Sequence, residues 1–165
     1  MPRRCFFSFH YQNDNWRASQ IRNIGRIESN RPATDNDWEQ VRRGGQQAIR
    51  YWIDSQLIGR SCTIVLVGEQ TANRPWINYE IIESWNRGMG VVGINIHGLQ
   101  DMTTRYSRIG LNPFDYVFFA NQTPMSRVVP RFDPPGLESR ARYGWIQRNL
   151  TEIVEDAIAI RQRYP

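Results

Sequence analysis

A tryptophan and a glutamate four residues apart, Trp76 and Glu80, are the residues in this sequence whose types and spacing best suit chemistry. Residues four apart lie on one face of a helix. A carboxylate can hydrogen-bond sugar hydroxyls and stabilise developing positive charge, as in glycoside hydrolysis, and an aromatic ring can stack beside it. The alternatives are a solvated glutamate stabilised by a helix N-terminus and a tryptophan that only packs.

The elements around this pair place it at a ligand-binding edge. The continuous apolar run at 62–67, closed by Gly68, is typical of a strand covered on both faces. Pro75 favours the first position of a helix, so Trp76 and Glu80 are expected in that helix's first turn. In open α/β sheets, ligands bind at the carboxyl ends of the strands, where this loop and helix begin.

Other candidate side chains belong to the same edge. An aromatic strand over residues 5–10 would bring Ser8, Phe9 and His10 there if it neighbours the 62–67 strand. Successive strand residues face opposite sides, so Ser8 and His10 alternate with Phe9. Arg74 could bind a phosphate, although a surface arginine is the ordinary interpretation. A histidine in the position of His10 is more often a satisfied polar residue at a strand end than an acid or base.

Several known chemistries lack their motifs. No glycine fingerprint for a dinucleotide follows the first strand, and a chain without lysine has no P-loop. The two histidines, His10 and His97, have no metal-ligand spacing to cysteine or acid. Cys5 and Cys62 lie in expected strands and are interpreted as small buried residues. We therefore expect no metal and no bound cofactor.

Composition bounds the partners and the compartment. The chain has 165 residues, one domain by length, and a net charge of +5 carried by arginine. Such a balance favours anionic partners, but the arginines are scattered and no nucleic-acid-binding signature accompanies them. Neither a signal peptide nor a membrane-spanning run is apparent. We expect a cytosolic protein that binds neither membranes nor nucleic acid.

The remaining segments complete an alternating pattern. Residues 11–15 are expected to form a turn in which Asn13 or Asp14 caps the next helix, and a helix from Asp37 is expected to break at Gly44–Gly45. Further strands are expected at 26–28, 91–96 and 115–119, a loop at 29–37, and helices ending at 59 and spanning 145–163. Strands that alternate with helices predict a doubly wound α/β domain, with helices on both faces of a mostly parallel sheet.

A resemblance joins these segments. Residues 3–12 (RRCFFSFHYQ) and 62–81 (CTIVLVGEQTANRPWINYEI), with 93–97 (GINIH) and 112–116 (NPFDY), are similar in order to the TIR-like proteins of bacterial Thoeris anti-phage defence. The match covers most of the chain from residue 3 to about 116. It implies a flavodoxin-like TIR fold, as a single domain over residues 1–165, and places the family's catalytic glutamate on Glu80.

The resemblance also implies an activity. Its members cleave NAD, as substrate, at the nicotinamide glycosidic bond and make an ADP-ribose-derived signal, cyclic or linear, that reaches a separate effector by diffusion. Such an enzyme can be silent until triggered, and a homo-oligomer is open. Ser8, Phe9, His10, Arg74 and Trp76 would then bind substrate. The alternatives are a non-catalytic TIR-like interaction module and a nucleotide sensor that does not cleave. Catalysis requires Glu80 to face a cavity.

Overall fold

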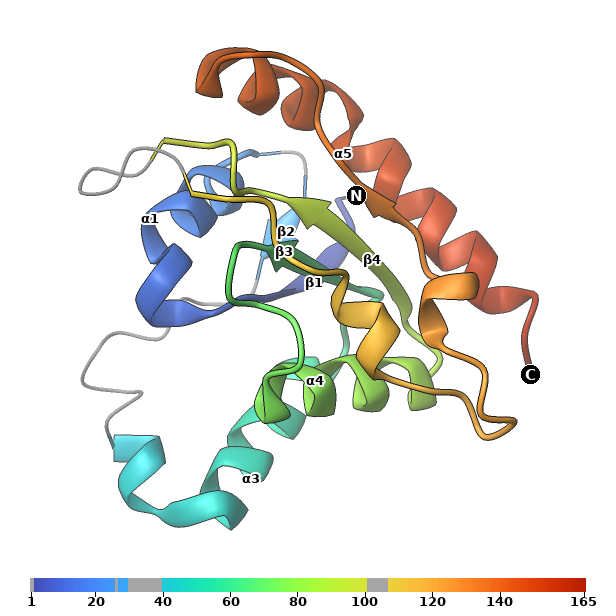
Figure 1. Ribbon diagram of the computed structural model, residues 1–165. Coiled ribbons are helices and arrows are strands. Elements are labelled where there is room, and N and C mark those ends of the chain that lie inside the picture. Colours follow the sequence, from blue (N-terminus) through green and yellow to red (C-terminus); the bar gives the residue numbers. More distant parts are fainter. Residues whose placement is uncertain (1, 26, 30–39, 101–106) are drawn as a thin grey trace.

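A parallel sheet forms the centre of the molecule, with helices on both of its faces (Figure 1). The computed structural model describes residues 2–25, 27–29, 40–100 and 107–165. Within these residues the sheet has five strands in the order β2-β1-β3-β4-β5, and each neighbouring pair is parallel. The strands are β1 (Arg4–Ser8), β2 (Glu28–Ser29), β3 (Cys62–Val67), β4 (Gly90–Asn95) and β5 (Arg131–Phe132). This is the flavodoxin-like order, so the expected doubly wound α/β fold is confirmed.

The helices are divided between the two faces of the sheet (Figure 1). One face packs against α1 and α5, and the other against α3 and α4, each side with its own buried apolar clusters. The bounds are α1 (Tyr11–Arg22), α3 (Gly45–Leu57), α4 (Pro75–Asn86) and α5 (Ser139–Gln162), with short 3-10 helices η1 (Pro113–Tyr116) and η2 (Met125–Arg127). The strand at 62–67 and the helix start at Pro75 are confirmed to the residue.

The alternation of β1 decides which side chains can reach α4. Cys5 and Phe7 belong to the cluster under α1 and α5, whereas Phe6 belongs to the cluster under α3. Ser8 therefore points to the same side as Phe6, beside its register partner Val65 on β3. Cys5 pairs in register with Cys62, and both are fully buried free thiols, as expected of small core residues.

The first helix begins earlier than expected. Residues 11–15 are not a turn, because α1 starts at Tyr11 and His10 is its N-cap. His10 Nδ1 accepts the Asn13 backbone N–H at 3.2 Å, so neither Asn13 nor Asp14 caps the helix. Asp14 instead lies inside α1, fully buried, and pairs with Arg17 at 3.1 Å. The N-cap acceptor of α1 is therefore a histidine ring nitrogen and not the side chain of Asn13 or Asp14, as we had expected.

Predictions for the second half were partly wrong. Residues 115–119 form no edge strand: Pro113 begins η1, whose first turn is capped by the Asn112 side chain, and Phe118 makes an isolated bridge. The edge position belongs to β5 (Arg131–Phe132), and α5 begins at Ser139 instead of residue 145. Strand β4 lies one residue before the predicted 91–96.

The remaining predictions concern the segment between β1 and β3. The break at the glycine pair is confirmed: Gly44 is the N-cap of α3, and Gly45 has φ +84°, which favours glycine. Strand β2 spans residues 28 and 29 instead of 26–28, and residue 26 lies outside the described part. A helix start at Asp37 and most of the 29–37 loop also fall outside the described residues.

Candidate active site

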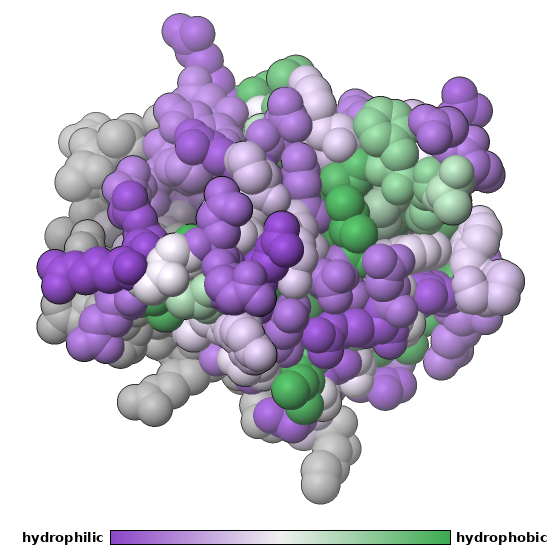
Figure 2. Space-filling view, turned by 90° about the horizontal axis from the view of Figure 1, so that it is seen from below, coloured by the Kyte–Doolittle hydropathy of each residue, from purple (hydrophilic) through white to green (hydrophobic). Residues whose placement is uncertain are grey.

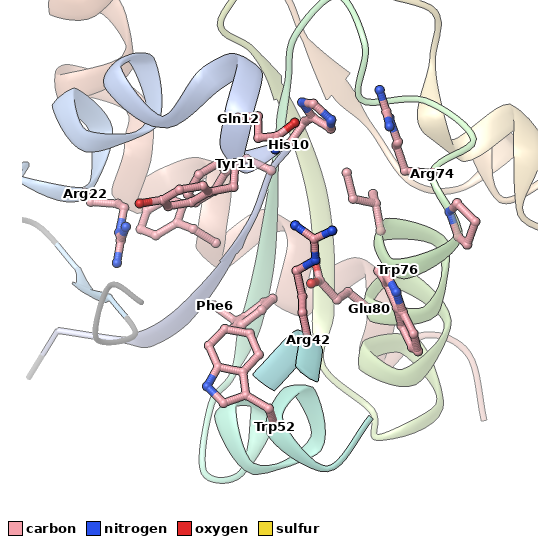
Figure 3. A pocket seen from close by; sticks show the side chains of 14 residues that line it. Phe6, His10, Tyr11, Gln12, Arg22, Arg42, Trp52, Arg74, Trp76 and Glu80 are labelled. Carbon is pink, nitrogen blue, oxygen red and sulfur yellow. The ribbon is translucent and has the colours of Figure 1, made fainter. Parts of the chain in front are cut away.

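A pocket opens at the carboxyl ends of β1 and β3, where the chain order of the sheet reverses (Figure 3). Its volume is about 340 Å³, within the range of small-molecule sites. In doubly wound sheets this reversal is where ligands bind. The pocket is lined by Phe6, Phe7, Phe9, His10, Tyr11, Gln12, Arg22, Arg42, Trp52, Arg74, Pro75, Trp76, Ile77 and Glu80.

Glu80 faces this pocket from α4, half-buried. We had expected Glu80 in the first turn of α4, but because α4 begins at Pro75, Glu80 lies in the second turn. No acidic residue occupies the first turn. The Ser8 hydroxyl donates a short hydrogen bond to Glu80 Oε2. Burial raises the pKa of Glu80 to about 8, although the Ser8 hydrogen bond opposes this rise. The raised pKa favours the protonated form of Glu80 at neutral pH.

Hydroxyl groups fix the turn of α4 that carries Glu80. The Ser84 hydroxyl donates to the Glu80 backbone carbonyl at 2.6 Å and shares a 2.6 Å hydrogen bond with the Thr63 hydroxyl of β3. Ser84 and Thr63 are both fully buried. The helix is thus bonded to the central strand one turn after the glutamate, while Ser8 holds the glutamate's side chain from β1.

Trp76 lies one turn before Glu80 and lines the same pocket. It is half-buried and meets Tyr79 edge-on, with ring centroids 5.8 Å apart. Trp76 therefore both packs and borders the site, so the two alternatives from the sequence are not exclusive. Glu83 on the same helix does not line the pocket; its carboxylate lies 3.7 Å from Arg87.

The end of β1 contributes as expected, with a division of roles. Phe9 and His10 line the pocket, whereas Ser8, 1% exposed, reaches it only through Glu80. Phe9 stacks with Tyr11 at 6.2 Å, and the Arg22 guanidinium lies 5.9 Å from the Phe9 ring. Burial, and then the charge of Arg74, lower the pKa of His10. Arg74 is exposed at the rim, where it bonds to Gln70.

Sequence reasoning missed part of the pocket. Arg22 from α1, Arg42 before the glycine break and Trp52 from α3 all line it. Phe6 was recoverable, because it shares the face of Ser8 by strand alternation. Arg22, Arg42 and Trp52 belong to segments far from Glu80 in the sequence, and no sequence signal shows that they lie near it in space. With three arginines and one largely protonated glutamate, the lining is positively charged.

Among the residues that the structure describes, no group of three or more histidine, cysteine or acidic side chains is arranged to hold a metal ion. None of the described helices combines the length and the apolar character needed to cross a membrane.

Two comparisons with known proteins bear on this site. A family model described as "Thoeris protein ThsB, TIR-like domain" matches residues 6–101. A protein of Bacillus cereus (strain MSX-D12) named "Putative cyclic ADP-D-ribose synthase ThsB1" is 36% identical over 122 residues. The match covers 71% of this chain and 64% of that protein, so this chain spans less than two thirds of the relative's length.

Proposed function

The chain belongs to the family of TIR-like domains of the Thoeris protein ThsB, and on this basis we propose that it cleaves NAD at the nicotinamide glycosidic bond, with Glu80 as the catalytic carboxylate. The observation that carries the proposal is the position of Glu80: it faces a pocket at the reversal point of the sheet, one helical turn from an aromatic ring. A module that only bound other proteins would not need a glutamate in a cavity.

The reaction suits a site with one carboxylate. The bond between ribose C1′ and the nicotinamide nitrogen breaks, and its electron pair leaves with nicotinamide, which becomes neutral and needs no strong acid. Positive charge develops on the ribose, and an ionised Glu80 stabilises it while accepting hydrogen bonds from the ribose hydroxyls. The cationic nicotinamide ring of bound NAD favours that ionised form.

The ribosyl cation is then captured by a nucleophile. We propose that the product is an ADP-ribose-derived signal of the cyclic kind, in which a nucleophilic atom elsewhere in the same molecule forms the new bond to C1′. The name of the Bacillus cereus relative supports this product class. The aromatic lining, including Phe9, Trp52 and Trp76, offers stacking surfaces for two bases in one pocket. The signal would act on a separate effector.

The test is release of nicotinamide by Glu80→Gln, which keeps the size of the side chain but cannot carry negative charge. We expect at least a 100-fold loss in nicotinamide and product, measured by mass spectrometry of extracts from phage-challenged cells. Glu83→Gln is the matched control, because Glu83 lies on the same helix outside the pocket. Equal product from wild type and Glu80→Gln, with both folded by circular dichroism, would overturn the proposal.

A further inference from the structure

Two hydrogen-bond donors border one end of the pocket, from loops that follow different strands. His10 follows β1, and Arg74 precedes α4 after the β3 loop. Both line the pocket, and Figure 3 shows them on the same side of Glu80. The crevice between β1 and β3 thus has a basic group on each side.

The hydrogen bonds of His10 define which ring atom is available. Its Nδ1 accepts the Asn13 backbone N–H at 3.2 Å, so a neutral ring carries its proton on Nε2. The N-cap bond also fixes the ring in place, since losing it would leave a helix N–H without a partner. His10 therefore offers a fixed Nε2–H donor from the pocket wall.

Arg74 is held but not neutralised. Its Nε donates to the Gln70 carbonyl at 3.0 Å and its Nη2 to the Gln70 side-chain oxygen at 3.2 Å. Within the described part of the chain these acceptors are uncharged, and no carboxylate pairs with Arg74. A guanidinium has five N–H donors, so three remain for a ligand.

Charge and spacing identify the ligand group. The other charged groups lining the pocket are Arg22 from α1, Arg42 before α3, and Glu80, so the lining attracts anions. Arg74 precedes Glu80 by six residues, or about 9 Å along a helix axis. Arg74 is the N-cap of α4, and both it and Glu80 line the pocket, so the two side chains can contact different parts of one extended ligand.

We propose that Arg74 and His10 clamp the diphosphate of the substrate, each donating hydrogen bonds across the β1–β3 crevice while Glu80 meets the ribose. This inference rests on the proposed function, because it names the part of NAD that this end of the site recognises. The clamp sets the register of the substrate, so that the glycosidic bond lies beside Glu80. Arg74 and His10 are substrate-binding residues in this account.

Binding of ADP-ribose tests the clamp without turnover, since ADP-ribose keeps the diphosphate and lacks the scissile bond. Titration of the purified full chain should give an affinity about tenfold weaker for Arg74→Gln than for wild type. Arg74→Lys, which keeps the charge but not the planar fork, should fall between them. Arg140→Gln is the control, because Arg140 is an exposed arginine of α5 outside the pocket and carries the same charge change.

The histidine ring gives a second readout by nuclear magnetic resonance. The chain has two histidines, so His97 serves as an internal reference. ADP-ribose should raise the pKa of His10 by about half a unit or more in wild type and leave His97 unchanged, since an anion favours the charged ring. Arg74→Gln alone should also raise the pKa of His10, because the Arg74 charge lowers it.

The outcomes separate the two proposals. If ADP-ribose binds wild type and Arg74→Gln equally and the pKa of His10 does not move, the clamp is wrong while NAD cleavage stands. Failure of wild type to bind ADP-ribose at all would also overturn the clamp. If, in addition, Glu80→Gln left nicotinamide release unchanged, the proposed function itself would fall.

Discussion

Glu80 is a carboxyl group that the folded protein prefers to keep protonated. Its pKa of about 8 lies above the usual glutamate value of 4.5 because burial disfavours the charged form. Between these two values the folded state holds a proton that the unfolded chain has released. The free energy of unfolding should therefore fall as pH rises from about 4.5 to about 8. The carboxyl group that we propose as catalytic therefore lies where its ionisation costs stability.

Glu80→Gln should accordingly stabilise the protein at alkaline pH. Glutamine resembles the protonated carboxyl, so the variant escapes the cost of ionisation. We expect almost no gain at pH 4.5 and a gain of about 4 kcal/mol in the free energy of unfolding at pH 8.5. Thermal unfolding of wild type and variant across this range measures it. A gain that did not change with pH would contradict the assigned pKa.

Ser8 acts on Glu80 and does not line the pocket itself. Its hydroxyl bonds to Oε2 and lowers the pKa of the carboxyl. Ser8→Ala should therefore raise the pKa of Glu80, which moves the rise of kcat/KM with pH to higher pH and reduces activity at pH 7.5 several-fold. Activity should recover toward pH 9, which a merely damaged fold would not allow.

The matched control for this variant is Ser19→Ala. Ser19 lies on α1, where its hydroxyl bonds to the Trp16 carbonyl at an exposed position. Its pH profile should coincide with that of wild type. Ser8 would be a positioning residue only if the two variants differ in the position of the profile and not just in its height.

At the scale of elements, α1 is tied to two loops at the functional edge by buried charge. Arg17 is 1% exposed, pairs with Asp14 at 3.1 Å and donates to the Leu99 carbonyl at 3.0 Å. The Asp14 carboxylate lies where a Cβ on Gly68 would be. Helix α1 and the turn after β3 therefore approach too closely for any side chain at residue 68.

Gly68→Ala should consequently be strongly destabilising. The methyl group would collide with a fully buried carboxylate that is paired with Arg17, and we expect a loss of at least about 3 kcal/mol in the free energy of unfolding. Gly25→Ala is the control, since a Cβ there meets nothing within 4 Å. Urea unfolding of both variants measures the difference. Equal stability would mean that α1 can move away from the turn.

At the scale of the whole molecule, α5 makes the last part of the chain integral to the domain. Leu150 is fully buried in the apolar cluster that joins α5 to β3, β4 and α1. The ion pair between Arg3 and Glu155 of α5, 2.8 Å apart, is exposed and therefore contributes little to the stability of the fold. The attachment of α5 is therefore hydrophobic, and it covers the face of the sheet opposite Glu80.

Two leucine substitutions test this attachment. Leu150→Ala should lower the free energy of unfolding by about 3 kcal/mol, because it leaves a cavity in the core. Leu137→Ala removes the same atoms at a position that is 98% exposed and should change stability by less than about 0.5 kcal/mol. Chemical denaturation distinguishes them. Similar, small effects would show that α5 is not part of the cooperative core.

Apolar and polar residues are not separated on the outer surface as they are between the core and the surface. In Figure 2, hydrophilic residues cover most of the face seen from below, and the hydrophobic residues gather in a few patches, the largest of them at the upper right of the view. Among the described residues, exposed apolar side chains occur on several elements, such as Tyr51, Ile58 and Phe118. Single exposed apolar residues are normal on protein surfaces and have no functional meaning by themselves.

The sequence by itself determined the centre of this protein. Strand β3 and the start of α4 follow from a continuous apolar run and a proline at a helix start, which are local signals. The alternation of helices and strands indicated the fold class. The family was indicated by the ordered resemblance over residues 3–12, 62–81, 93–97 and 112–116. The predicted face shared by Trp76 and Glu80 is confirmed, since both line the pocket.

Only the tertiary structure decided what surrounds that centre. Arg22, Arg42 and Trp52 reach the pocket through chain reversals, and the hydrogen bond between Ser8 and Glu80 joins residues whose distance in sequence conceals their contact. The edge strand β5 has two residues, too few for a periodic pattern to mark them. The run at 115–119 is not a strand, because its first two residues belong to η1, which Pro113 begins and the Asn112 side chain caps. Periodicity records which side of an element is buried. It does not record what the buried side meets.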